Sequence, residues 1–159
     1  MALTLPRSLI NWSSMPTGRT DDWHQYIASI KPTYDHLIRL AGQVSGMLIL
    51  PDIESRLRAA LQMYRPLGVQ VSELIGELQK IKPPTAGQSH YANLAIGAHK
   101  LCDVIHELEF NLTKKIDVTQ ENGRYDGLTR CLQMLKCVSD PWSGLQPVKF
   151  DGCCACCID

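Results

Sequence analysis

Residues 21–50 read DDWHQYIASIKPTYDHLIRLAGQVSGMLIL, and the spacing of their large apolar side chains decides the fold. These side chains recur alternately four and three residues apart. The positions of this seam are Trp23, Ile27, Ile30, Tyr34, Leu37, Ala41, Val44 and Leu48. Because an α-helix has about 3.6 residues per turn, the seam occupies one helix face, which predicts burial of that face. Asp21 and Asp22 suit the positive end of the helix dipole and indicate where the helix begins.

The same periodicity returns twice further along the chain. Within residues 51–82 the seam consists of Ile53, Leu57, Ala60, Tyr64, Leu67, Val71, Leu74, Leu78 and Ile81. Within residues 89–116 it consists of Tyr91, Leu94, Ala98, Leu101, Ile105, Leu108 and Leu112. Pro83 and Pro84 predict the end of the second helix, since neither can continue it. A shorter helix is predicted over residues 125–138, with Leu128, Leu132 and Leu135 on one face.

The links between these helices are short, so neighbouring helices are expected to run antiparallel. The sequence therefore predicts an all-α fold, an elongated antiparallel bundle of three long helices and a shorter fourth. The bundle is expected to span residues 20–139, between an irregular N-terminal segment (1–19) and an irregular Cys-rich C-terminal tail (140–159). The alternative is a long coiled coil that is completed only by dimerisation.

Two prolines and two glycines interrupt the helical pattern. If the first two helices form a hairpin that turns at Leu50-Pro51, Pro32 and Pro66 lie within about one helical turn of the same level. Such a pair predicts a shared bend, and the alternative is a helix that splits at either proline. Gly42 and Gly46, four residues apart in GQVSG, predict a close contact with another helix.

The composition excludes several classes of protein. The 16 Lys and Arg residues balance the 16 Asp and Glu residues, so we expect no binding of nucleic acid. No apolar run approaches the roughly 18–20 residues of a membrane-spanning helix, and the first residues do not resemble a secretory signal. The sequence therefore predicts a cytoplasmic protein, with possible peripheral membrane association, whose cysteines stay reduced or bind metal.

The third helix carries a candidate metal site. His99, Cys102 and His106 are spaced by three and four residues, which places them on neighbouring turns. Two imidazoles and a thiolate are plausible ligands for Zn²⁺ or copper, with His90 or the C-terminal tail as the fourth. His99 and His106 face away from the seam, however, so the alternative is a pair of exposed histidines beside a partly buried cysteine.

The tail, DGCCACCID, contains Cys153, Cys154, Cys156 and Cys157. Four thiolates could bind Zn²⁺ or Cu(I), although adjacent cysteines fit the tetrahedral geometry of structural zinc sites poorly. Cys156 is fourth from the end, as in a prenylation motif, so lipidation at Cys156 or Cys157 is a second interpretation. The final residue, Asp159, is unfavourable for that modification. Disulfides within the tail are the least favoured reading, since the pairs are too close in sequence. Internal Cys131 and Cys137 are expected to be small core or surface residues.

No Ser-His-Asp arrangement, phosphate-binding loop or dinucleotide fingerprint occurs, so no catalytic residue is predicted. The leading hypothesis is a non-enzymatic scaffold that binds a protein partner or a second copy of itself, at the side left open by the short fourth helix. One alternative is a thiol-rich metal-binding or redox protein that uses the C-terminal cysteines. Another is a small-molecule carrier or enzyme with a site inside the bundle near the two prolines, lined by Tyr34, Tyr64 and Cys102.

Overall fold

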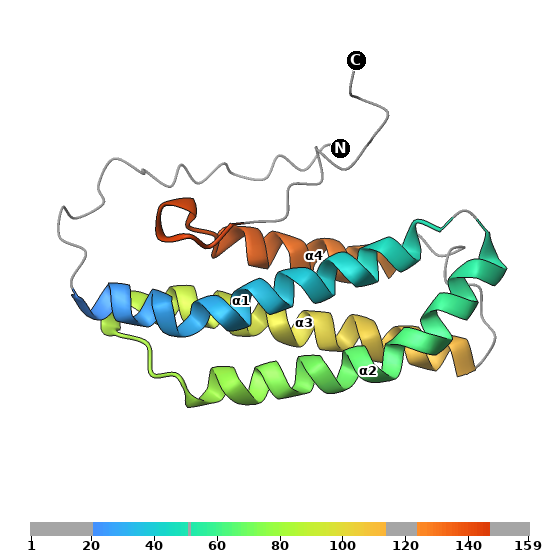
Figure 1. Cartoon of the computed structure of the whole chain (residues 1–159), viewed down its shortest axis with the longest axis horizontal. Coiled ribbons are helices and arrows are strands. Elements are labelled where there is room, and N and C mark those ends of the chain that lie inside the picture. The colour runs from blue at the N-terminus through green and yellow to red at the C-terminus, as the bar shows by residue number, and fades with distance from the viewer. Residues whose placement is uncertain (1–20, 51, 114–123, 147–159) are drawn as a thin grey trace, which may run out of the picture.

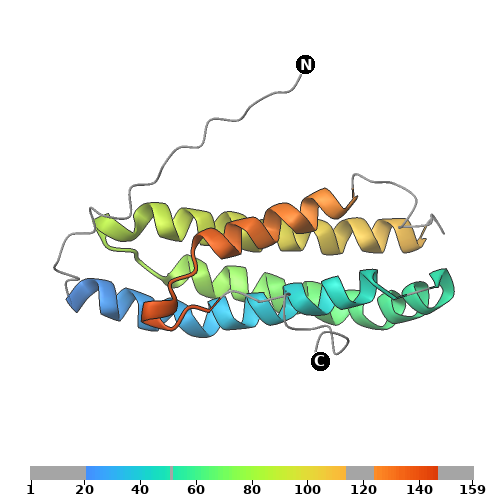
Figure 2. The ribbon, with the colours of Figure 1, turned by 90° about the horizontal axis from the view of Figure 1, so that it is seen from above.

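The computed structural model describes residues 21–50, 52–113 and 124–146 and confirms the all-α prediction. Its four helices are α1 (Asp21–Leu48), α2 (Ile53–Lys80), α3 (Gln88–Thr113) and α4 (Arg124–Cys137). Two short 3-10 helices, η2 (Thr85–Gly87) and η3 (Pro141–Ser143), precede α3 and follow α4. Figure 1 shows α4 on one side of the elongated bundle and α2 on the other. Figure 2, seen from above, shows α4 crossing over α3, with its C-terminal end slanting toward α1.

The ends of α2 are set by its own sequence. Asp52 is the N-cap, a position that favours Asp. Its Oδ1 accepts a hydrogen bond from the backbone N–H of Ser55 at 2.7 Å. The hydrogen bonds from Ser55 hold the pKa of Asp52 below its usual value, because they favour the carboxylate. At the other end the N–H of Ile81 bonds to the carbonyl of Leu78 at 3.0 Å, two residues before Pro83.

Neither proline splits its helix. Pro32 lies inside α1 and Pro66 lies inside α2, and Figure 1 shows that α2 bends along its length. His36 on α1 contacts Gln70 on α2 (Nε2 to Oε1, 3.2 Å). This pairing puts the two prolines about two helical turns apart along the hairpin, rather than within one turn. The first half of α2 is inclined to the bundle axis, so each of its residues covers less distance along that axis than a residue of α1 does. More residues of α2 than of α1 therefore separate the His36–Gln70 contact from the turn between the two helices.

The predicted seams form the core. Most of their described side chains are buried, including Ile30, Tyr34 and Leu37 on α1. On α1 the buried face is wider than the seam, because this helix packs against both α2 and α4. It therefore also buries Tyr26, Leu40 and Met47, which a single seam does not contain, whereas Trp23 stays partly exposed.

Close helix contacts occur at other glycines than the predicted pair. A Cβ atom added at Gly42 or Gly46 would meet no described residue within 4 Å, so the prediction of a close contact there with another of the described helices is wrong. At Gly97 on α3 an added Cβ would lie 3.2 Å from Leu135, and at Gly127 on α4 it would lie 3.0 Å from Val104. These two glycines let α3 and α4 approach each other. The spacing of Gly42 and Gly46 predicted close packing, but the spacing alone does not show which residues face that part of α1.

The C-terminal end of α4 is completed by side chains from two other helices. The last carbonyl groups of a helix have no partner within it. The hydroxyl of Tyr34 on α1 donates to the carbonyl of Leu135 at 3.1 Å, and Nε2 of His90 on α3 donates to the carbonyl of Val138 at 2.8 Å. Burial raises the pKa of Tyr34 to about 12. Both bonds therefore hold the end of α4 against the bundle.

After α4 the chain forms a closed hook, residues 140–145, in place of the coil expected there. The backbone groups of Asp140 and Leu145 exchange two hydrogen bonds of 3.0 and 2.9 Å. Gly144 closes the turn with φ 83°. This left-handed conformation favours glycine, which has no Cβ. Nζ of Lys31 on α1 donates to the Gly144 carbonyl at 2.8 Å, and the Leu145 side chain is fully buried. The first residues of the predicted irregular tail are thus anchored in the bundle.

Candidate functional site

An open groove of about 470 Å³ runs along the outer surface between α2 and α3. The residues that α2 contributes to it are Tyr64, Arg65, Gly68, Val69, Ser72 and Glu73. The residues that α3 contributes are Ile105, His106 and Glu109. The α3 lining spans little more than one helical turn, so the groove can hold one or two side chains of a partner rather than a length of helix.

The floor of the groove is apolar. Ile105 is buried in the core cluster, and a Cβ atom added at Gly68 would lie 3.7 Å from its Cγ2 atom. Because Gly68 has no side chain, the surface of α2 is recessed where this helix crosses Ile105. Beside this floor Val69 is 59% exposed, although no seam requires an aliphatic side chain there. Large aliphatic residues are more often buried than exposed. Val69 thus offers apolar surface beside the floor that a partner could cover.

One wall of the groove combines an aromatic ring with a cation. Nε of Arg65 donates to the hydroxyl of Tyr64 at 3.1 Å, and the guanidinium carbon lies 5.8 Å from the centre of that ring. The contact orients the planar guanidinium group along the wall. A guanidinium held in this way can stack on a further aromatic ring or pair with a carboxylate.

The rim is polar and carries charges of both signs. Arg65 supplies a positive charge, and Glu73, eight residues further along α2, supplies a negative charge. Two more exposed apolar residues, Leu61 on α2 and Phe110 on α3, lie close in sequence to the lining. An apolar centre within a polar rim is the usual composition of a protein-binding surface.

The predicted metal trio lies beside this groove, and only part of it comes together. Sγ of Cys102 lies 3.9 Å from Nδ1 and 4.0 Å from Nε2 of His106, both on α3. Within the three described ranges, no group of three His, Cys, Asp or Glu side chains is arranged to hold a metal ion, and His99 is exposed. Burial, and then the charge of Asp103, raises the pKa of Cys102, so this thiol is protonated at neutral pH.

His90, the predicted fourth ligand, has another role. Its Nδ1 contacts the Tyr26 hydroxyl at 3.0 Å, and its Nε2 donates to the Val138 carbonyl at 2.8 Å. Its ring also packs edge-on against Trp23 and Tyr26, with ring centres 5.6 and 5.7 Å apart. Both ring nitrogens of His90 are thus engaged within the bundle, and its role as a fourth metal ligand stays a prediction.

The side chains proposed to line an internal cavity do not meet. Tyr34 is fully buried and bonds toward α4, whereas Tyr64 lines the outer groove between α2 and α3. Cys102 lies on α3, beside His106 at that same outer groove. These three residues therefore do not surround one site inside the bundle.

The remaining cysteines divide between the core and the surface. Cys131 is fully buried, with its Sγ 3.4 Å from the Gly97 carbonyl, and burial raises its pKa to about 12. Cys137 is exposed. Cys153, Cys154, Cys156 and Cys157 lie outside the described residues, so their predicted metal binding or lipidation stays a prediction. None of the helices in the described ranges is both long and apolar enough to cross a membrane.

Several groove residues were not singled out from the sequence. Val69 lies off the seam of α2, and Arg65 and Glu73 belong to its polar face. A large apolar residue away from a seam was the signal that could have indicated this surface. Which helix faces α2 at that point, however, depends on the fold as a whole.

Comparison with known proteins supplies no relative, since no family model, curated protein or solved structure matches the chain.

Proposed function

We propose that this chain is a non-enzymatic interaction protein that binds a protein partner through the groove between α2 and α3. The observation that carries the proposal is the open groove above Gly68 and Ile105, where Val69 is exposed to solvent and polar side chains surround it. The sequence favoured the side left open by the short fourth helix. The groove lies on the α2 side, away from α4, and Val69 exposes apolar surface there.

The size and charge of the groove define the partner. Its volume is about 470 Å³. Space of this size suits one large apolar or aromatic anchor side chain. Arg65, held against Tyr64, can stack on an aromatic anchor. A basic residue beside the anchor would pair with Glu73. The partner is therefore a protein surface that presents an aromatic residue next to Lys or Arg.

Peptide display tests this proposal. A library of constrained peptides would be selected on the full chain, and the enriched peptides would be measured against Val69→Arg and against Ile96→Arg as a matched control. Ile96 is an exposed β-branched residue of α3 (47% exposed) that does not line the groove. Both variants replace an exposed aliphatic side chain, so both should fold.

The expected result is enrichment of peptides with an aromatic anchor, whose affinity falls at least roughly tenfold with Val69→Arg and is unchanged with Ile96→Arg. Peptides that bind both variants as well as the unchanged chain would refute the groove as the site. A selection that enriches nothing would do the same.

A further inference from the structure

The hook at residues 140–145 presents one aromatic side chain to solvent. Trp142, at the tip, is 94% exposed, more than any other large apolar residue that the structure describes. An indole ring in water leaves a large apolar area unburied, and Trp is among the residues most enriched at binding hot spots. Its exposure is therefore a cost that a binding role would offset.

The hook holds Trp142 in a defined place. The two backbone bonds between Asp140 and Leu145 close the loop, and the hydroxyl of Ser143 donates to Oδ2 of Asp140 at 2.7 Å. Lys31 ties the hook to α1, and Leu145 ties it to the core. Because the backbone is already ordered, docking of the indole would require little further loss of conformational entropy.

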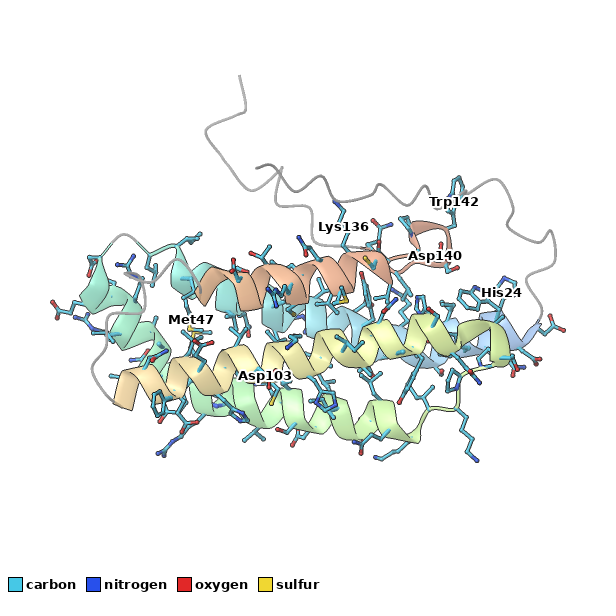
Figure 3. The ribbon with its side chains drawn as sticks, turned by 180° about the vertical axis from the view of Figure 1, so that it is seen from behind. His24, Met47, Asp103, Lys136, Asp140 and Trp142 are labelled. Atoms are coloured by element: carbon cyan, nitrogen blue, oxygen red, sulfur yellow. The ribbon has the colours of Figure 1, made fainter. Side chains whose placement is uncertain are left out.

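The surroundings of Trp142 have the chemistry proposed for the partner of the groove, an aromatic residue next to Lys or Arg. Lys136, an exposed residue of α4, projects from the same side of the molecule as Trp142 in Figure 3. The hook side thus combines an aromatic anchor with a basic residue. The groove combines an apolar floor and a guanidinium wall with the carboxylate of Glu73. The two surfaces are complementary in charge, since Lys136 lies on the hook side and Glu73 lines the groove.

We infer that the groove between α2 and α3 receives Trp142 of a second copy of this chain. The inference rests on the proposed function and names the partner of the same groove. The indole would lie on Gly68 and Val69 and stack on Arg65, and Lys136 would pair with Glu73.

The contact cannot be made within one molecule. The hook follows α4 and lies against α1, whereas α2 lies on the other side of the bundle from α4 (Figure 1). Each copy therefore keeps a free hook when its groove is filled, and a free groove when its hook is docked. A head-to-tail contact of this kind forms open chains, or rings if the rotation closes. One anchor residue buries little surface, so the association should be weak and dependent on concentration.

The experiment uses two variants, each of which loses one surface. Trp142→Ala removes the anchor and keeps the groove, and Val69→Arg blocks the groove and keeps the anchor. Sedimentation velocity of the full chain would follow association from micromolar to near-millimolar concentration, with reductant present so that disulfides cannot link the copies. Ile96→Arg again serves as the matched control.

The unchanged chain and Ile96→Arg should associate as concentration rises, and each of the other two variants should lose at least roughly tenfold in association constant. An equimolar mixture of Trp142→Ala and Val69→Arg should form a heterodimer, because one intact hook meets one intact groove. Failure of the mixture to associate would overturn the inference, as would a monomeric unchanged chain or association that survives either variant.

Two further readouts separate the alternatives. Peptides selected on the groove should still bind Trp142→Ala, so the groove can be a binding site even if the second copy is not its partner. Vesicles of phosphatidylserine and phosphatidylcholine test the other use of an exposed indole. A blue shift of tryptophan emission on adding vesicles, present in the unchanged chain and absent in Trp142→Ala, would assign Trp142 to a lipid surface and overturn the inference.

Discussion

The hydroxyl of Tyr26 on α1 lies 3.0 Å from Nδ1 of His90 on α3, inside a cluster that also contains Trp23. The carbonyl of Val138 can only accept a hydrogen bond, so Nε2 of His90 must carry a hydrogen atom. In the neutral ring Nδ1 is then an acceptor, and Tyr26 donates to it. Three elements of the fold therefore meet at one neutral imidazole.

Acid should weaken the bundle through His90. Burial lowers its pKa, more than the bond to Val138 and the charge of Asp140 raise it. The unfolded chain then binds a proton more readily than the folded one, so stability is fully present above a pH of about 6.5 and falls as the pH drops below it. Urea unfolding at pH 7.5 and 5.5 should show this loss, and His90→Gln should reduce it. Equal losses in both proteins would contradict the assignment.

Removal of the Tyr34 hydroxyl should destabilise the fold more than removal of the Tyr91 hydroxyl. Tyr34→Phe leaves the Leu135 carbonyl without the partner that α1 supplies. The free energy of unfolding should fall by about 1 to about 2 kcal/mol, the usual cost of a buried polar group left unpaired. Tyr91 donates to the Leu78 carbonyl at 2.8 Å, but that oxygen also accepts from the N–H of Ile81. Tyr91→Phe should therefore cost less. Equal effects in denaturant unfolding would show that capping by Tyr34 is unimportant.

Substitution of two helical glycines should have opposite effects. Gly68→Ala places a methyl group at an ordinary contact distance from Ile105. The gain in helix propensity should stabilise α2 by roughly 0.5 to roughly 1 kcal/mol. The same methyl group raises the groove floor, so the selected peptides should bind this variant more weakly.

Gly97→Ala gains the same helix propensity, but its new methyl group would lie 3.2 Å from Leu135. Crowding of a packed core costs free energy, so this variant should be neutral or destabilising. Thermal unfolding and peptide titration would measure both effects, and equal gains in stability would contradict the close contact at Gly97.

The core should depend on Leu145 and not on the last eight residues. Leu145→Ala removes a fully buried side chain. The free energy of unfolding should fall by about 2 to about 4 kcal/mol. Deletion of residues 152–159, which hold the four clustered cysteines, should leave helicity and melting temperature nearly unchanged. Circular dichroism of both variants would show the difference. A deletion as damaging as Leu145→Ala would make the tail a structural site.

The periodic part of the fold could be predicted from the sequence, because a helical seam depends on local spacing alone. The four helices, the short α4 and the buried residues of the seams follow from it. The hook could not, because Pro141 and Gly144 are typical of coil, and the burial of Leu145 and the bond from Lys31 that anchor it depend on the packed bundle. The groove was also missed, since Val69 and Ile105 come from different helices and meet only after packing. The contacts of His90 with Tyr26 and Val138 were missed for the same reason.

Side chains of α1 and α3 cap the C-terminal end of α4, and this affects how the chain folds as it is synthesised. This helix has 14 residues and contains Gly127. A helix so short is marginal on its own in water. It can order only on a surface that α1 and α3 have already built, where Tyr34 and His90 receive its last carbonyl groups. These helices leave the ribosome first. Between the docking of α3 and the arrival of α4, the nascent chain exposes an apolar trough, and that interval is where we expect it to be most prone to aggregation.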